Sequence, residues 1–370
     1  MHTYSLFVEF KKIFMSKKPL ILGIETSCDE TAASIIQNDS SGVPKILSNI
    51  VSSQFDIHKK FGGVVPDLAA RAHVEKIDLI VNEALKKSNK KFNEIDAIAA
   101  TAGPGLIVCL TVGLNFAKTL SLSLNKPFIA VNHLEGHALS PKLHTKLSYP
   151  YLLLIISGGH SQFLSVNNLC DYTRLGTTID DALGEAFDKT AKLLGVEFPG
   201  GPKIEILAKK GNPNKYDLPL PIINKGGCNF SFAGLKTAIL RITKNIKTEQ
   251  DKFDIAASFQ NVIEKIIYKK TQIAFEEYLK INKKNKNFVV AGGVAANKNI
   301  RKKIEEVSLK NNFEVFFPDS DLCGDNAAMI AMVGLEKFKL SKFDSHEFKA
   351  DPRWQLDKKA KFLKGAGVIL

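Results

Sequence analysis

Two histidines stand one helical turn apart in the segment VNHLEGHALS, residues 131 to 140. Asn132 is a favourable N-cap for a helix that follows the short apolar strand PFIAV. On such a helix His133 and His137 project from the same face, so both imidazoles could bind one metal ion. The alternative is a pair of surface histidines without a ligand role, and a third ligand would decide between the two interpretations.

Glu135 distinguishes this segment from the H-E-x-x-H signature of zinc proteases. It follows His133 by two positions, which places it about 200° around the helix. Its carboxylate therefore points away from a metal held by the two histidines and cannot act as the general base of a protease. Pro141 should end the helix before His144 is reached.

A candidate third ligand is Asp325, in the segment SDLCGDNAAMIAMVG near the C-terminus. It follows a small turn and precedes an apolar helix, so it could instead be the N-cap of that helix. Two histidines and one carboxylate favour iron(II), with zinc, manganese or magnesium as alternatives.

Two segments share one plan, in which an apolar strand, a small polar turn and a second strand follow one another. They cover residues 20–36 and 151–166, and the second has SGGH at its turn. Turns of this kind gather backbone N–H groups that suit phosphate oxygens. Either hairpin alone would be an ordinary buried hairpin, but the repetition favours two phosphate loops.

The remaining elements indicate an α/β protein, because predicted strands and helices alternate. Residues 95–124 predict a strand, a Gly-Pro-Gly turn and an apolar helix, without the third glycine of a dinucleotide-binding fingerprint. Residues 180–195 predict an amphipathic helix, and FPGGPK a rigid turn after it. Residues 209–230 read as a surface loop, and residues 288–306 as a strand, a glycine turn and a helix.

The composition is that of a globular protein, with 45% hydrophobic and 24% charged residues in 370. A chain of this length favours two domains. The net charge of +13 fits a polyanionic partner such as a nucleic acid. However, only five of the 51 basic residues are arginine, and a general lysine bias would give the same excess.

The cysteines and the apolar runs bear on location. Five scattered cysteines without a C-x-x-C pair predict a reducing, cytoplasmic environment. We find no apolar run of the roughly 18 to 20 residues that span a bilayer, and therefore expect no membrane association. Residues 1–15 are excluded from the fold prediction, because Met15 is a plausible alternative start.

Ten motifs, in order, resemble those of one family, the tRNA threonylcarbamoyladenosine transferases (TsaD, formerly described as O-sialoglycoprotein endopeptidase). The resemblance extends from about residue 19 to about residue 355, and the motifs are GIETSCDET, GGVVPDLAARAH, AGPG, NHLEGH, ISGGHSQ, GEAFDKTAKLLG, PGGP, FSFAGLKT, AGGVAANKNIR and CGDNAAMIA.

The resemblance implies a two-lobed fold like that of actin, Hsp70 and sugar kinases, with duplicated ribonuclease-H-like domains. The first lobe is expected to hold residues 16–132 with 318–350, and the second residues 133–317. Residues 1–15 would be an extension, and residues 351–370 a C-terminal tail.

The implied activity is transfer of the threonylcarbamoyl group from threonylcarbamoyl-AMP to N6 of the adenosine 3′ of the anticodon, with release of AMP. The tRNAs would be those that read codons beginning with A. Expected partners are a TsaB-like paralogue and a TsaE-like ATPase. The rival functions are a metalloprotease and a non-catalytic scaffold of the same fold, and the scaffold would be expected to lack the histidines.

The resemblance also assigns roles to residues. One divalent metal per chain would be held by His133, His137 and Asp325, and Asp29 and Glu30 would line the reaction centre. Glu205 stands where some members have aspartate. The implied substrate-binding residues are Ile155, Ile156, Ser157, Gly158, Gly159, Asp188, Gly201 and Asn297.

Overall fold

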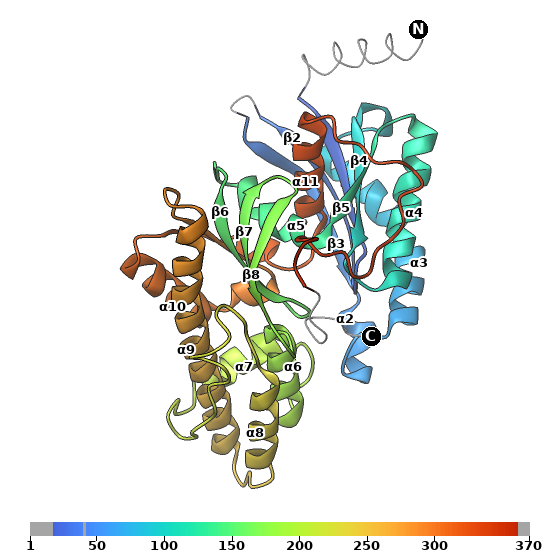
Figure 1. Ribbon diagram of the computed structural model, residues 1–370. Helices are drawn as coiled ribbons and strands as arrows, with labels where there is room; N and C mark the ends of the chain where they lie inside the picture. The colour runs from blue at the N-terminus through green and yellow to red at the C-terminus, as the bar shows by residue number, and fades with distance from the viewer. Residues whose placement is uncertain (1–17, 40–41, 362–370) are drawn as a thin grey trace. The chain divides into compact units, whose positions relative to one another are not determined.

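The computed structural model describes residues 18–39 and 42–361, and its internal contacts separate them into two units. The first unit holds the described residues up to Gln54, Pro66–Lys146 and Asn326–Trp354 (Figure 1). The second holds Phe55–Val65, Leu147–Asp325 and the described residues from Gln355 onward. The expected extension, residues 1–15, lies outside the described residues.

The first unit is built on a five-stranded sheet in the order β3-β2-β1-β4-β5. β1 and β2 form the predicted antiparallel hairpin, with Glu25 opposite Ala32. β4 pairs in parallel with both β1 and β5. The strands are β1 (Leu20–Glu25), β2 (Glu30–Asn38), β3 (Pro44–Ser53), β4 (Ala97–Gly103) and β5 (Phe128–Asn132).

Helices cover both faces of this sheet. On one face Leu22 and Ile24 of β1 share a hydrophobic core with Val81 of α3 (Pro66–Ser88) and with α4 (Ile107–Leu124). On the other face α11 (Ala327–Lys339) lies directly against β1. A Cβ on Gly23 would come within 2.4 Å of the Ala327 carbonyl oxygen, so glycine allows this close approach.

α4 corrects one sequence-based prediction. It is the one described helix that is long and apolar enough, by length and composition, to cross a membrane. Its Leu114 and Ala117 are buried in the core with α3, although only a third of the helix is buried. Interspersed Ser, Thr and Asn residues and Lys118 hid this run in the sequence.

The second unit repeats the strand order of the first, β8-β7-β6-β9-β10. β6 and β7 form the second predicted hairpin, while β9 pairs in parallel with β6 and β10. The two sheets therefore have the same topology, which confirms the expected duplication. The strands are β6 (Tyr151–Ile156), β7 (Ser161–Asn168), β8 (Asp171–Thr177), β9 (Asn287–Ala291) and β10 (Glu314–Phe316).

A large apolar core joins this second sheet to its helices. Phe187 of α6 packs edge-on against Phe259 of α9, with ring centroids 5.0 Å apart. The predicted apolar face of α6, which includes Leu183 and Thr190, is buried. The helices are α2 (Phe55–His58), α6 (Leu183–Leu193), α7 (Gly200–Ala208), α8 (Ala233–Thr243), α9 (Glu249–Ile281) and α10 (Lys298–Lys310).

α7 shows that the prediction of a rigid turn at FPGGPK was wrong. The helix begins at Gly200, with Pro199 as its N-cap. A Cβ on Gly200 would lie 2.5 Å from the Cβ of Ala191, so this glycine serves close packing of α7 on α6. The predicted loop follows α7 and carries no helix or strand up to residue 229.

The units begin and end at other residues than the predicted lobes. α5 (His133–Leu139) belongs to the first unit, because Asn132 at the end of β5 caps it. Residues 351–354 of the expected tail also belong to that unit, where Trp354 packs on Phe348 at a ring distance of 5.3 Å.

Candidate metal centre and substrate turns

α5 presents the histidine pair as predicted. The Asn132 side chain accepts hydrogen bonds from the backbone N–H groups of Leu134 and Glu135 and so fixes the start of the helix. His133 and His137 are buried, and their rings meet edge to face with centroids 4.8 Å apart. The interpretation of the pair as surface histidines is therefore wrong.

Asp325 completes a group of three possible metal ligands. One ligand atom from each of His133, His137 and Asp325 lies within 4.8 Å of the others. The N-cap of α11 is Asn326, which accepts a hydrogen bond from Met329 N at 3.1 Å, so Asp325 does not have the N-cap role. Two imidazoles and a carboxylate this close to one another fit a divalent ion such as iron(II) or zinc.

A glycine lets the histidine helix α5 pack closely on α11, which begins two residues after Asp325. Gly136 lies between the histidines on α5, and a Cβ there would be 3.1 Å from Ile330 and Met329 of α11. α5 therefore packs closely on the helix that directly follows Asp325.

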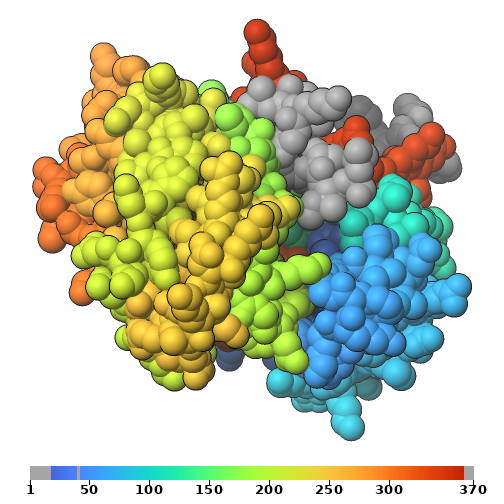
Figure 2. All heavy atoms as spheres, turned by 90° about the horizontal axis from the view of Figure 1, so that it is seen from below, coloured from blue at the N-terminus to red at the C-terminus, as the bar shows by residue number. Residues whose placement is uncertain are grey.

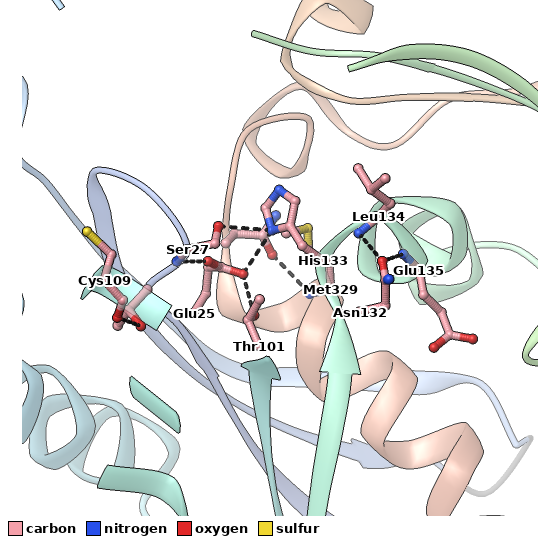
Figure 3. Close-up of polar contacts among 11 residues, drawn as sticks. Glu25, Ser27, Thr101, Cys109, Asn132, His133, Leu134, Glu135 and Met329 are labelled. Carbon is pink, nitrogen blue, oxygen red and sulfur yellow. Dashed lines mark hydrogen bonds and ion pairs between the residues drawn. The ribbon is translucent and has the colours of Figure 1, made fainter. Parts of the chain in front are cut away.

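Glu135 points away from His133, as the helix geometry predicts (Figure 3). It is buried, and its carboxylate lies 3.4 Å from the ammonium of Lys337. Lys337 also donates a hydrogen bond to the Ala130 carbonyl at 2.9 Å. This ion pair joins α5 to α11, which is a structural role and not that of a general base.

Glu25 is a functional candidate that the sequence analysis missed. It is 1% exposed at the end of β1, and its Oε2 lies 3.1 Å from His133 Nδ1 (Figure 3). Thr101 Oγ1 donates to the same oxygen at 2.5 Å, and Ser27 N donates to Oε1. A buried acid at the end of an apolar strand was the available sequence signal, but its partners lie far away along the chain.

The turn that holds Asp29 and Glu30 is fixed from several sides. His73, which is buried on α3, has Nε2 3.0 Å from the Cys28 carbonyl oxygen and Nδ1 2.8 Å from Thr31 Oγ1. The backbone N–H of Gln54 donates to the Asp29 carbonyl at 3.0 Å. Both predicted catalytic carboxylates therefore sit on a rigid segment and are only partly buried.

The Cys109 thiol near this turn is not a nucleophile. Burial raises its pKa to about 12, and the negative charges of Asp29 and Asp67 add to the effect. A thiol with such a pKa is protonated at neutral pH. All five cysteines are free, in accord with the absence of a disulfide framework in the sequence.

The predicted substrate turn after β6 offers backbone N–H groups. Ile155 and Ile156 are buried in the strand. Ser157 and His160 close the turn, since Ser157 N donates to the His160 carbonyl at 2.8 Å and His160 N to Ser157 Oγ at 3.1 Å. Within the described chain, the N–H groups of Gly158 and Gly159 make no hydrogen bond, and a Cβ on either glycine would meet open space.

The remaining predicted substrate residues are linked to one another in the second unit. Asp188 Oδ1 accepts a hydrogen bond from Gly200 N at 2.6 Å, next to Gly201. The Asn297 side chain caps α10 and exchanges hydrogen bonds of 3.1 and 3.3 Å with Gln260. Glu205 of α7 accepts from the Lys298 backbone at 3.0 Å. These contacts join α6, α7, α9 and α10.

Comparison with known proteins gives a family. The family described as tRNA N6-adenosine threonylcarbamoyltransferase (TsaD) matches residues 45–332. A protein of that name from Pelagibacter ubique is 70% identical over 357 residues, which cover 96% of this chain and 100% of the relative. One from Rickettsia rickettsii is 51% identical over 91% of this chain and 98% of its own length. One from Brucella anthropi is 49% identical over 94% of this chain and 98% of its own length.

Solved structures agree on the fold. HypF from T. kodakarensis superimposes with a TM-score of 0.59 at 16% identity, over 88% of this chain and 48% of HypF. A full-length HypF in a phosphate- and nucleotide-bound form gives a TM-score of 0.56 at 15% identity, over 89% of this chain and 48% of HypF. At such identities the likeness concerns the fold alone, and with the duplicated sheets it confirms the predicted actin-like, Hsp70-like and sugar-kinase-like class.

Proposed function

This chain belongs to the tRNA N6-adenosine threonylcarbamoyltransferase family, and we propose that it modifies the adenosine 3′ of the anticodon in tRNAs that read codons beginning with A. The donor is threonylcarbamoyl-AMP, and AMP is released. The observation that carries the proposal is the 70% identity to a relative of that name over nearly the full chain. The group of two buried histidines, His133 and His137, with the partly buried Asp325 supports it.

The reaction requires positioning more than strong acid or base catalysis. N6 of adenine attacks the carbamoyl carbon of the donor, a C–N bond forms, and the bond to the phosphate oxygen breaks, so that AMP leaves with the electron pair. N6 loses one proton. Because N6 is a weak nucleophile and the donor is already activated, orientation and charge stabilisation supply most of the rate enhancement.

Residues of the second unit are suited to the donor. The N–H groups of Gly158 and Gly159, which make no hydrogen bond to any described residue, can bind phosphate or carbonyl oxygens. Asp188, whose Oδ1 accepts a hydrogen bond from Gly200 N, is a carboxylate of the kind that accepts ribose hydroxyls. Asn297 holds the glycine turn after β9 through its bonds to α10 and Gln260.

Asp29, Glu30 and the two histidines of the first unit, together with Asp325, are suited to the proton transfer and to the metal. Asp29 or Glu30 would accept the N6 proton, from a turn whose backbone is already fixed. His133, His137 and Asp325 would hold one divalent ion, with iron(II) as the favoured metal, which would stabilise negative charge on donor oxygens.

Partners and location follow the family pattern. A TsaB-like paralogue and a TsaE-like ATPase would act with this chain in the cytoplasm. Free cysteines and the absence of a C-x-x-C pair fit that environment.

Two rival functions fit the structure less well. A metalloprotease needs a base beside the metal, whereas Glu135 is bound to Lys337. A scaffold would not need two buried histidines beside a carboxylate, since buried polar groups cost stability unless a metal or hydrogen bonds compensate.

The test is reconstitution with purified components. The protein, threonylcarbamoyl-AMP, a substrate tRNA and the two partners should yield threonylcarbamoyladenosine, detected by mass spectrometry of tRNA nucleosides. A tRNA with another base after the anticodon should remain unmodified. No product from intact components, beside a working relative as positive control, would overturn the assignment.

A further inference from the structure

We propose that Glu25 is a positioning residue that fixes the His133 imidazole for metal binding. The inference rests on the metal centre described above. It assigns to Glu25 the task of keeping the hydrogen on Nδ1, so that the Nε2 lone pair is available to the ion.

The first argument is the set of donors around the Glu25 carboxylate. Ser27 N–H donates to Oε1, and Thr101 O–H donates to Oε2 at 2.5 Å. His133 Nδ1 lies 3.1 Å from Oε2. An ionised carboxylate only accepts hydrogen bonds, so its contact with His133 requires the hydrogen on Nδ1. Ser27 Oγ, 3.2 Å from the same nitrogen, is then a second acceptor for that hydrogen, since a hydroxyl can accept as well as donate. A neutral imidazole with Nδ1–H has its lone pair on Nε2.

The second argument is that the carboxylate cannot turn away. Glu25 is 1% exposed, and each oxygen is held from a different element. Ser27 lies in the turn after β1, and Thr101 in the neighbouring strand β4. Such a buried group has a fixed orientation, which is the property that a partner to a metal-binding histidine needs.

The same carboxylate connects the metal centre to the turn between β1 and β2. Oε1 holds the backbone of Ser27, two residues before Asp29, while Oε2 holds His133. The turn is also anchored by Leu106 N–H, which donates to the Ser27 carbonyl at 2.9 Å. Ligand orientation and turn conformation therefore depend on one side chain.

Glutamine at this position cannot reproduce the contacts, although its size is the same. If its oxygen faces Thr101 and His133, its NH₂ group faces the Ser27 N–H, and two donors oppose each other. If the amide is flipped, its NH₂ group donates to His133 Nδ1 and moves the histidine hydrogen to Nε2. Either orientation costs metal affinity.

The experiment compares Glu25→Gln with Glu135→Gln in the full chain. Zinc and cobalt(II) dissociation constants would be measured by competition with a chelator. Glu25→Gln should weaken binding about 10- to 100-fold. Glu135 is an equally buried acid on the histidine helix itself, but it pairs with Lys337, so Glu135→Gln should change metal affinity less than about 3-fold. Equal affinities in the two variants would overturn the proposal.

A second measurement needs no variant at Glu25. In the metal-free protein labelled with ¹⁵N-histidine, the His133 resonances, assigned by comparison with His133→Ala, should show the Nδ1–H form. The Nε2–H form would overturn the proposal even if Glu25→Gln failed to fold. Both readouts are independent of tRNA modification, so loss of the proposed activity and loss of this positioning role would be told apart.

Discussion

At the scale of single residues, the histidine pair makes the first prediction. His133→Ala or His137→Ala should remove most of the bound metal, because each variant leaves only two of three ligands. Elemental analysis of purified protein would measure occupancy. His144→Ala is the matched control, since His144 is exposed beyond the end of α5. Full occupancy in the double variant would contradict the ligand assignment.

Asp188 makes a second prediction, in which binding and stability must be separated. Asp188→Ala should weaken binding of AMP and also lower the free energy of unfolding by about 1 to 3 kcal/mol, because Gly200 N–H loses its acceptor. Asp188→Asn keeps an acceptor for Gly200, so it should lose less stability.

Calorimetry with AMP and urea denaturation separate the two effects of Asp188. A ribose hydrogen bond to a charged acceptor contributes about 1.5 to 3 kcal/mol. Unchanged AMP affinity in both variants would leave Asp188 with only its role in joining α6 to α7.

Residue spacing predicts contacts within one helix and fails for contacts across a sheet. His133 and His137 could be paired from the sequence because helix geometry fixes neighbours one turn apart. Glu25 and His133 are 108 residues apart, and their contact depends on the register of β1, β4 and β5. No local pattern encodes that register, so Glu25 went unnoticed although it lies within a recognised motif.

At the scale of elements, the turn after β6 depends on the start of α6. Gly184 N–H donates to the Ser157 carbonyl at 3.0 Å, and a Cβ on Gly184 would lie 2.7 Å from that oxygen. Gly184→Ala should therefore displace the turn and reduce AMP affinity at least 10-fold, a loss of about 1.4 kcal/mol. Gly63→Ala is a suitable control, because a Cβ there meets no atom within 4 Å. Equal AMP affinities in these two variants would mean that the turn does not bind the donor.

The two hairpins could be predicted because each is local, with both strands and the turn contiguous in sequence. The start of α7 could not, since Pro and Gly signal a turn by their local preferences. There tertiary packing decides: the lack of a Cβ on Gly200 lets α7 approach Ala191 of α6. The identical strand order of the two sheets also exceeds what local patterns reveal.

At the scale of the whole molecule, the question is which lysines of the +13 chain serve binding. Several are paired with acids on their own helix, such as Lys280 with Glu277 and Lys303 with Glu306. α8 differs. The sequence from residue 218 to residue 248 contains five basic and no acidic residues. Lys236, Arg241 and Lys244 are exposed, and no ion pair in the described part of the chain includes them.

We therefore expect α8 to contribute to the binding of tRNA phosphates. Figure 2 looks onto the end of the second unit where α8 and the turn into α9, in yellow, face the viewer. The triple variant Lys236→Gln, Arg241→Gln, Lys244→Gln should weaken tRNA binding. It should also reduce the slope of log K against log salt by about 0.7 to 0.9 for each phosphate that the variant no longer neutralises.

The control for α8 removes the same charge elsewhere. Lys280→Gln, Lys303→Gln, Lys310→Gln changes the net charge equally, but these three lysines are paired with Glu277 or Glu306. Binding would be measured by filter retention of tRNA at several salt concentrations. A specific surface predicts that only the α8 variant has a reduced slope, because only its cations are unpaired and can displace counterions from the tRNA. Equal reductions of the slope in both variants would show that net charge alone attracts tRNA. If tRNA binding to the unaltered protein did not depend on salt concentration, the lysine excess would be a compositional bias without a role in binding.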